Sequence, residues 1–471
     1  MEESHSASGK NWVLAVASLA SFIVALDTMV LSSALATIRA NFHAPMEMLQ
    51  WTVNAYNLSF AVLLLTGAAL GDRFGRRRMF GLGVALFMLA SIGCAVSSNI
   101  DGLIAARAAQ GAAAALTLPL AMALLSAAFP REERARALGI FSSVTGLALI
   151  TGPAIGGALT EIFGWQWIFW INAPIGIIAL GMVWLRLSES SGPAARLDLF
   201  GLVLVAAAAF ALVWTLLRGN SAGWRSAEVL TALICGALLA VAFVIWEERT
   251  VAPMVPPRLF RVRAFSSGIV ASFLFYAAMY GVLFLLPQLL QSALGNTAFG
   301  AGLRLLPWTA TLFVTAPIAG GVVSKIGERT LVVIGLSMQA IGLLWIALIV
   351  APGMAYSALV PPLVIAGVGV SAAMPAVQNA VLGSVAVVEM GKASGIFNMG
   401  RFLGGVFGVA LLVATFSANS AGPSPKDFTA GFAAAMFMAA FLSLCGAIAG
   451  SRLPARERIL AAPAPRGARS R

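Results

Sequence analysis

The residue best placed to do chemistry is Asp27, which lies well inside the apolar run of residues 12–38. A charged carboxylate at the centre of a bilayer costs about 2.5–3.5 kcal/mol on insertion scales, and desolvation favours its protonated form. Asp27 could therefore take up and release protons, or it could balance the charge of a cationic ligand. A structural carboxylate that is hydrogen-bonded within a helix bundle is the alternative.

Arg107 is the second charged candidate, and it lies near the start of the apolar run 103–128. Gln110 and Gly111 follow it by one helical turn and share its face. A buried guanidinium needs an acceptor, and Asp27 is a candidate for that acceptor. Extension of the arginine side chain to the outer interface is the alternative.

Arg304 and Arg401 are the other arginines inside apolar runs. Arg304 lies close to the start of its run, so we expect it to reach the interface, whereas Arg401 lies deeper. Polar groups in a membrane usually face an interior. We expect these residues to line a central cavity, or else to tie helices together: Asn54, Tyr56, Asn57, Gln110, Tyr276, Tyr280, Gln378, Asn379, Asn398 and Arg401. Aromatic rings near an acid would suit lipophilic cations.

A basic hinge, residues 67–78, separates two apolar runs and has the sequence Gly67-Ala68-Ala69-Leu70-Gly71-Asp72-Arg73-Phe74-Gly75-Arg76-Arg77-Arg78. Asp72 and the arginines can form ion pairs at helix ends that hold one conformation and release in another, which would make a gate. Arginines that only anchor the loop on one side of the membrane are the alternative.

The stretch Gly152-Pro153-Ala154-Ile155-Gly156-Gly157 could make a second moving part. Small residues at Gly-x-x-x-Gly spacing let helices approach closely, and proline bends a helix. We expect this stretch to act as a hinge or as a seal between two halves of the molecule, together with ordinary close packing.

Membrane helices must position these residues, because the chain of 471 residues is 60% hydrophobic and only 10% charged. Soluble domains are about 25% charged. Continuous apolar runs of about twenty residues predict helices rather than the alternating strands of a barrel. Fourteen runs can be placed, at 12–38, 50–70, 79–98, 103–128, 136–160, 166–186, 198–217, 227–246, 265–290, 300–323, 330–350, 356–384, 394–416 and 429–450.

Basic residues fix the predicted orientation. With a cytoplasmic N-terminus, 23 of the 30 lysines and arginines fall on the cytoplasmic side and four on the other. This asymmetry follows the positive-inside rule, so the net charge of +12 does not indicate nucleic-acid binding. Cys94, Cys235 and Cys445 are far apart and predict neither a disulfide framework nor a metal site.

The chain carries an internal repeat. Ala319–Arg329 aligns with the basic hinge at an offset of 252, and Pro375 follows Pro119 at an offset of 256. Parallel repeats of this kind in transporters place the substrate near the midplane, between two halves. We expect a cytoplasmic segment, an N-terminal six-helix bundle, two inserted helices, a cytoplasmic linker, a C-terminal six-helix bundle and a disordered basic tail, at 1–11, 12–187, 198–246, 247–264, 265–451 and 452–471.

These motifs resemble those of the major facilitator superfamily, in its fourteen-helix drug:proton antiporter branch. The hinge is similar to the loop signature of the family. Other matching stretches are Leu26-Asp27-Thr28, Leu103–Gly111, Gly152–Gly157, Trp165–Gly176, Leu286-Pro287-Gln288 and Ala301–Pro307. The chain departs from the family pattern at Met29, Ser32, Ala36 and Ala148.

The resemblance implies an all-α fold of two six-helix bundles with two extra helices between them. It also implies a role for Arg107, with Asp27, in proton coupling, and a role for the fifth helix in limiting leak. The residues expected to gate are Gly67, Gly71, Asp72, Arg73, Gly75, Arg76, Arg77, Gly152, Pro153, Gly156 and Gly157.

The expected function is proton-coupled export of lipophilic, often cationic drugs by alternating access. A dedicated exporter or importer of one metabolite and a non-transporting sensor or scaffold are the alternatives. No Gly-x-x-x-x-Gly-Lys loop occurs, and His5 and His43 form no catalytic set, so we expect no enzyme activity, no metal and no cofactor. We expect a monomer in the bacterial plasma (inner) membrane that works with protons and small lipophilic substrates. Association with periplasmic adaptor proteins stays open.

Overall fold

The computed structural model describes residues 2–192, 198–386, 389–420, 422 and 424–454, and the predicted basic tail lies almost wholly outside them. The described residues form helices and connecting turns, without strands. The first half holds α1 (Glu2–Phe42), α2 (Met46–Phe74), α3 (Arg76–Ala95), α4 (Ile100–Ala128), α5 (Arg131–Ile162), α6 (Trp167–Trp170) and α7 (Asn172–Arg186). Two helices follow, α8 (Leu199–Ala222) and α9 (Ala227–Arg249).

The second half begins with the short α10 (Pro257–Phe260). It continues through α11 (Arg263–Gln288) and its π-helical extension η1 (Leu289–Ala293), α12 (Ala298–Arg304), α13 (Leu306–Thr309), α14 (Thr311–Ile326), α15 (Glu328–Ile349), α16 (Tyr356–Leu382), α17 (Met390–Asn419) and α18 (Pro425–Gly450). Within the described residues, fourteen helical segments are long and apolar enough to cross a membrane, because α6 with α7, α11 with η1, and α12 to α14 each make one segment. The fourteen predicted runs are thereby confirmed.

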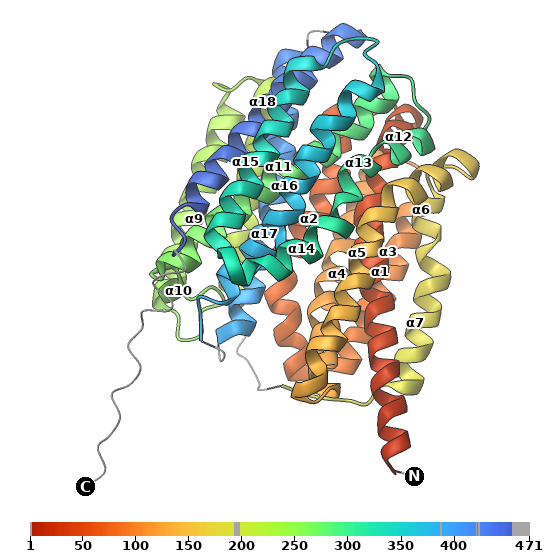
Figure 1. Cartoon of the computed structure of the whole chain (residues 1–471), viewed down its shortest axis with the longest axis vertical. Helices are drawn as coiled ribbons and strands as arrows, with labels where there is room; N and C mark the ends of the chain where they lie inside the picture. Colours follow the sequence, from red (N-terminus) through yellow and green to blue (C-terminus); the bar gives the residue numbers. More distant parts are fainter. Residues whose placement is uncertain (1, 193–197, 387–388, 421, 423, 455–471) are drawn as a thin grey trace.

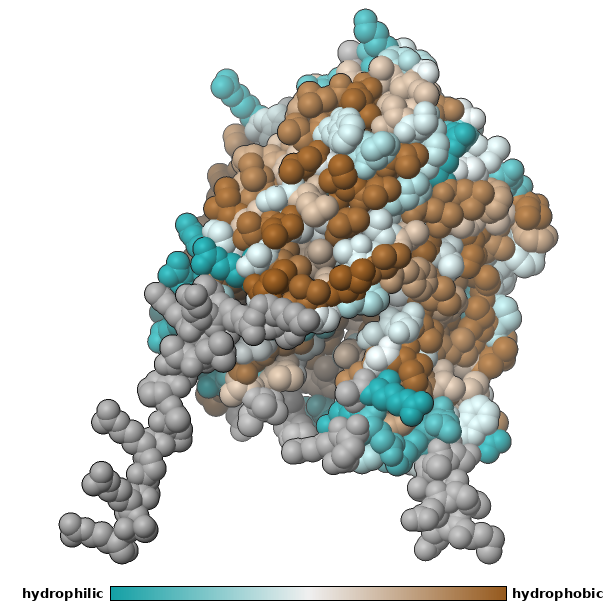
Figure 2. Space-filling model, in the orientation of Figure 1, coloured by the Kyte–Doolittle hydropathy of each residue, from teal (hydrophilic) through white to brown (hydrophobic). Residues whose placement is uncertain are grey.

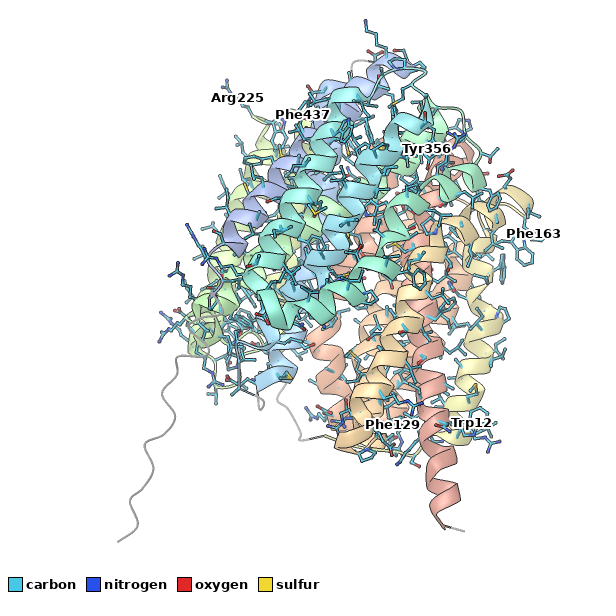
Figure 3. All side chains as sticks on the ribbon, viewed as in Figure 1. Trp12, Phe129, Phe163, Arg225, Tyr356 and Phe437 are labelled. Carbon is cyan, nitrogen blue, oxygen red and sulfur yellow. The ribbon has the colours of Figure 1, made fainter. Side chains whose placement is uncertain are left out.

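The two halves stand side by side, α1–α7 in red to yellow and α11–α18 in green to blue (Figure 1). Of the inserted pair, α8 packs against α2 of one half and α17 of the other, and α9 packs mainly on α8. Apolar side chains cover the flank in view, and polar ones gather toward its ends (Figure 2). Trp12 and Phe129 lie toward the end where the chain begins, whereas Arg225 and Tyr356 lie toward the opposite end (Figure 3).

The internal repeat is visible in the backbone. Gly75 joins α2 to α3 with φ +99°, and Gly327 joins α14 to α15 with φ +82°. Both positions have a backbone conformation that residues other than glycine rarely adopt. The two glycines are separated by the offset of 252 that the sequence repeat predicts, so the same turn serves both halves.

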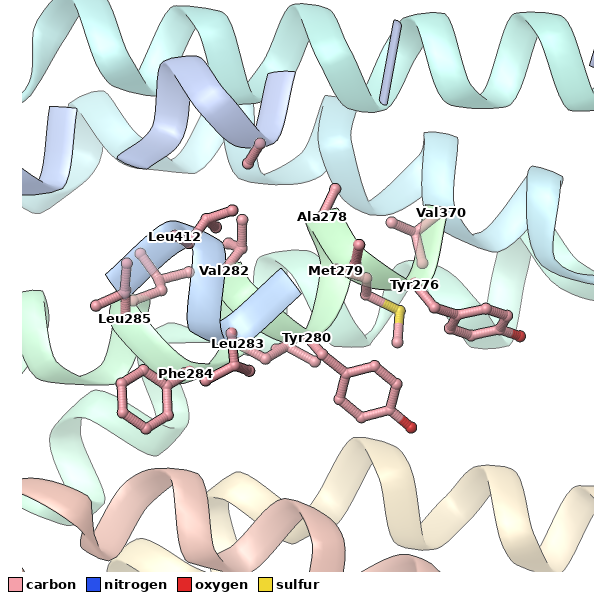
Figure 4. Packing of buried hydrophobic residues seen from close by; sticks show 14 of the residues in the cluster. Tyr276, Ala278, Met279, Tyr280, Val282, Leu283, Phe284, Leu285, Val370 and Leu412 are labelled. Atoms are coloured by element: carbon pink, nitrogen blue, oxygen red, sulfur yellow. The ribbon is translucent and has the colours of Figure 1, made fainter. Parts of the chain in front are cut away.

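The largest apolar core is built around α11 of the second half and continues across the boundary to α1 of the first half. Val282 and Leu412 pack on one side of α11, whereas the Tyr280 ring projects toward the first half (Figure 4). One face of α11 therefore holds the second half together, and another faces the boundary between the halves.

Candidate functional site

A buried ion pair lies at the centre of the first half. Arg107 Nη1 on α4 donates to Asp27 Oδ2 on α1 at 2.5 Å, and the two side chains are 1% and 0% exposed. Arg107 Nε also donates to the Thr52 carbonyl oxygen on α2, at 3.0 Å. Arg107 therefore pairs with Asp27 and does not extend to the outer interface.

Amide side chains complete the coordination of this pair. Gln110 accepts from Arg107 Nη1 at 2.6 Å and donates to Asp27 Oδ1 at 2.8 Å. Asn172 on α7 donates to the same Asp27 oxygen at 3.2 Å and to Ser91 Oγ on α3 at 3.0 Å. A buried ion pair is tolerable only when further hydrogen bonds satisfy its remaining lone pairs and protons, and these amides do so.

Aromatic rings cover the guanidinium of Arg107. Its Cζ atom lies 4.3 Å from the Tyr56 ring centroid and 5.8 Å from that of Phe169. The pair, its amides and these rings thus connect five helical segments of the first half, namely α1, α2, α3, α4 and the α6–α7 segment. Sequence reasoning missed Asn172 and Ser91. Asn172 interrupts an apolar run and could have been noticed, but a serine in such a run carries no distinctive signal.

A cavity of about 710 Å³ lies between the halves. Its walls come from α1, α2, α4 and α5 on one side and from α11, α14, α16 and α17 on the other. A hollow between the two halves is visible at the end where the chain begins (Figure 2). Four of the ten residues expected to line a cavity do so, namely Tyr280, Gln378, Asn398 and Arg401.

The other six expected residues lie outside the cavity wall. Tyr56 and Gln110 contact the ion pair of Asp27 and Arg107. Tyr276 is buried against Arg401, whose Cζ atom lies 4.9 Å from the centroid of the Tyr276 ring. Asn54 and Asn57 are buried without a hydrogen-bond partner among the described residues, and Asn379 is exposed elsewhere. Small hydroxyl residues that the sequence did not single out line the cavity instead, among them Ser21, Thr28, Ser126, Ser142 and Thr145.

The cavity is closed at the end away from the N-terminus, where α5 meets α12. A Cβ atom on Gly157 would collide with the backbone of Ala298, and one on Gly302 would collide with the Pro153 carbonyl group. Glu161 Oε2 accepts from the Phe299 backbone N–H across the same boundary, at 3.2 Å. We call this contact between α5 and α12 the outer seal.

The glycines of α5 also bring it onto α1. A Cβ atom on Gly152 would meet Met29, and one on Gly156 would meet the backbone of Val30. The Ser33 hydroxyl on α1 donates to the Pro153 carbonyl oxygen at 2.7 Å. The stretch 152–157 therefore contacts α1 on one face and α12 on the other.

The basic hinge is held within the first half. Asp72 pairs with Arg76 at 2.7 Å, and the backbone N–H groups of Arg77 and Arg78 donate to the Glu189 carboxylate at 2.9 and 3.3 Å. Arg77 also donates to the Trp184 carbonyl oxygen, at 2.7 Å. Gly67 and Gly71 let α2 approach α4 closely, while Arg73 stacks on the neighbouring ring of Phe74. The gating role of the hinge stays a prediction.

The sequence matches a known protein family over most of its length. The family model of the Major Facilitator Superfamily matches residues 17–198 and 199–409. The chain belongs to the Major Facilitator Superfamily. Members of this superfamily are transporters, and the two halves around a shared cavity agree with that class.

Curated superfamily relatives are similar over most of the chain. The multidrug resistance protein Stp of Mycobacterium tuberculosis is 35% identical over 84% of this chain and 74% of its own length. The methylenomycin A resistance protein of Bacillus subtilis is 33% identical, over 87% and 88%. The cephamycin export protein CmcT of Amycolatopsis lactamdurans is 34% identical, over 94% and 93%.

Solved structures share the fold at low sequence identity. The POT family transporter PepTSo has a TM-score of 0.71 at 13% identity, over 94% of this chain and 97% of its own. A bacterial homologue of the lysosomal transporter Spinster, solved in an inward-facing conformation, has a TM-score of 0.69 at 16% identity, over 94% and 98%. Among the described residues, no group of three or more His, Cys, Asp or Glu side chains could hold a metal ion.

Proposed function

We propose that this chain is a proton-coupled exporter of lipophilic, drug-like compounds that works by alternating access. Relatives named for drug resistance and antibiotic export, at 33–35% identity over most of the chain, support the export of such compounds. The observation that carries the proton coupling is the buried pair of Asp27 and Arg107, which joins helices of one half beside the cavity.

The cavity opens on the side that the arginine distribution assigns to the cytoplasm, so the conformation described here is inward-facing. A substrate would enter from that side. Conversion to an outward-facing state would open the outer seal and bring the two halves together at the cytoplasmic ends of their helices. The basic hinge lies at that end and is placed to take part in closure.

Protonation of Asp27 would supply the switch. The neutral acid would lose its ionic attraction to Arg107, which would keep only the neutral acceptors at Thr52 and Gln110. Asp27, Met29 and Val30 lie within one turn of α1, and the latter two contact Gly152 and Gly156 of α5. A shift of this turn would therefore act on α5 and on the outer seal, which couples proton entry to the change of state.

The coupling proposal is tested by Asp27→Asn in proteoliposomes with an imposed proton gradient. We expect proton-driven efflux of a transported dye to be abolished while dye binding is retained, because the amide cannot release a proton and Asp27 lies outside the cavity wall. Glu228→Gln is the matched control, since this acid lies in a surface ion pair with Arg218 at 3.0 Å. Unchanged proton-driven efflux in Asp27→Asn would show that the coupling residue is another one.

A further inference from the structure

The two deep arginines of the membrane region have opposite environments. Arg107 is enclosed and paired with Asp27. Arg401, on α17, lies in the wall of the central cavity. No described carboxylate forms an ion pair with Arg401, and its Nε atom is buried without a hydrogen-bond partner among the described residues. One guanidinium is neutralised by the protein, and the other faces the space where a substrate would bind.

Arg401 is also the only residue with a full charge among the described residues of the cavity wall. The remaining polar groups of the wall are neutral hydroxyl, phenol and amide groups, and the rest of the lining is apolar. Asp27 cannot act as a counter-charge for a cationic ligand here, because it is 0% exposed and bound to Arg107. The cavity therefore presents a single uncompensated positive charge.

The neighbours of Arg401 hold its guanidinium in place. Its Cζ atom lies 4.9 Å from the Tyr276 ring centroid and 5.3 Å from that of Phe402. Rings stacked on a guanidinium leave its edge free for in-plane hydrogen bonds. Asn398 lies one turn earlier on α17, and Tyr280 on the facing helix is a hydrogen-bond partner of the Arg401 side chain; both residues line the cavity. A planar anionic group could thus bind Arg401 in the plane of the guanidinium, with neutral donors beside it.

We propose that Arg401 is the specificity-determining contact of this cavity and that the preferred substrates are lipophilic anions or zwitterions, which carry a carboxylate or a comparable acidic group on an aromatic frame. A cation in a partly dehydrated site lacks the solvation that water would give it, and a ligand anion supplies that missing interaction. A cationic ligand in the same space is repelled. The inference rests on the proposed function, because it concerns the cavity through which export would occur.

The test compares two dyes that share a xanthene frame and differ in charge, anionic fluorescein and cationic rhodamine 6G. Binding to the purified full-length chain in detergent is measured by fluorescence anisotropy. We expect the wild type to bind fluorescein more tightly, and Arg401→Gln to weaken fluorescein binding by about tenfold or more without weakening rhodamine binding. Arg401→Lys keeps the charge but loses the planar group, so it should still bind fluorescein more tightly than rhodamine 6G, with a smaller difference than in the wild type. Arg304→Gln is the matched control, since Arg304 stacks on Tyr356 outside the cavity wall.

Tighter binding of rhodamine by the wild type, or an equal loss for both dyes in Arg401→Gln, would overturn the proposal. If Arg401→Gln does not fold, the wild-type comparison and Arg401→Lys still decide. Proteoliposome transport separates the two proposals. If fluorescein binds more tightly than rhodamine 6G but a proton gradient transports neither dye, the anion site is supported and the proposed exporter is refuted. Proton-driven transport of rhodamine in preference to fluorescein would support the exporter and refute the anion site.

Discussion

The outer seal can be opened by a single methyl group. In Gly157→Ala, the added Cβ atom would lie 2.7 Å from Phe299 Cα and 2.8 Å from the Ala298 carbonyl carbon. Ordinary contacts between carbon atoms are about 3.5–4.0 Å, so α5 and α12 must separate by close to an ångström. Because the obstacle is backbone, no side-chain rotation can relieve it.

The cost of this overlap falls on the inward-facing state alone, if the seal opens in the outward-facing one. Overpacking by one methyl group typically costs about 1–3 kcal/mol. A difference of that size between two states changes their ratio by about 5–150-fold. Gly157→Ala should therefore shift the protein toward the outward-facing state without unfolding it.

Labelling of a cysteine at the seal measures the shift. Ser33 is completely buried and donates to the Pro153 carbonyl oxygen on α5. In a chain whose three native cysteines are replaced by serine, Ser33→Cys should react with a membrane-impermeant maleimide from the outer face only when the seal opens. We expect Gly157→Ala to raise this rate by about 5–150-fold, in proportion to the outward-facing population.

Gly139→Ala provides a control on the same helix, because a Cβ atom there would meet nothing within 4 Å. This control should leave the labelling rate unchanged. An unchanged rate in Gly157→Ala, or an equal rise in Gly139→Ala, would refute the assignment of this contact as the closed outer gate.

Three further predictions concern charge. Asp27→Asn and Arg107→Gln should each lower the free energy of unfolding by about 3–5 kcal/mol, because each leaves the other charge buried without its partner. The double variant should lose less than the sum of the two single losses, and thermal melting in detergent measures the interaction energy between the two residues. Asp72→Asn should impair transport more than Ser324→Ala, since Asp72 is an acid that pairs with Arg76, whereas the aligned position in the second copy of the hinge is a serine. Equal transport rates would contradict this asymmetry. Entry of one proton in exchange for exit of one monoanion moves two positive charges inward, so a membrane potential of 100 mV (inside negative) should add about 4.6 kcal/mol of driving force to the export of anionic substrates. Exchange of a proton for a monocation moves no net charge and should gain nothing from the potential. Efflux at membrane potentials clamped with valinomycin measures the difference.

Structural features that depend only on neighbouring residues in the chain were predictable from the sequence. A helix that crosses lipid must be apolar along its whole length, so each span shows as a continuous run, and all fourteen runs correspond to helical segments. The positive φ at Gly75 and Gly327 follows from the repeated glycine between two runs. The pairing of Asp27 with Arg107 was likewise a candidate from the sequence, because each charge deep in the membrane needs the other.

Rotation of a helix about its axis was not predictable to the same degree. Gln378 lines the cavity, whereas its neighbour Asn379 does not, and successive residues differ by about 100° around a helix. Continuous apolarity removes the amphipathic pattern that would fix this angle in a soluble helix. Asn54 and Asn57 illustrate the same difficulty, since polarity placed them in an interior but could not distinguish the central cavity from a contact between helices.

One turn of α1 around Asp27 contacts the buried arginine, the cavity and α5. Asp27 binds Arg107 within the first half, Thr28 lines the cavity, and Met29 and Val30 contact the glycines of α5. A carboxylate in the cavity itself would compete with an anionic substrate for the Arg401 guanidinium. The position of the proposed proton site on a different face of α1 avoids that competition. Proton and substrate would then act on the same helix from different sides, so their coupling requires no contact between them.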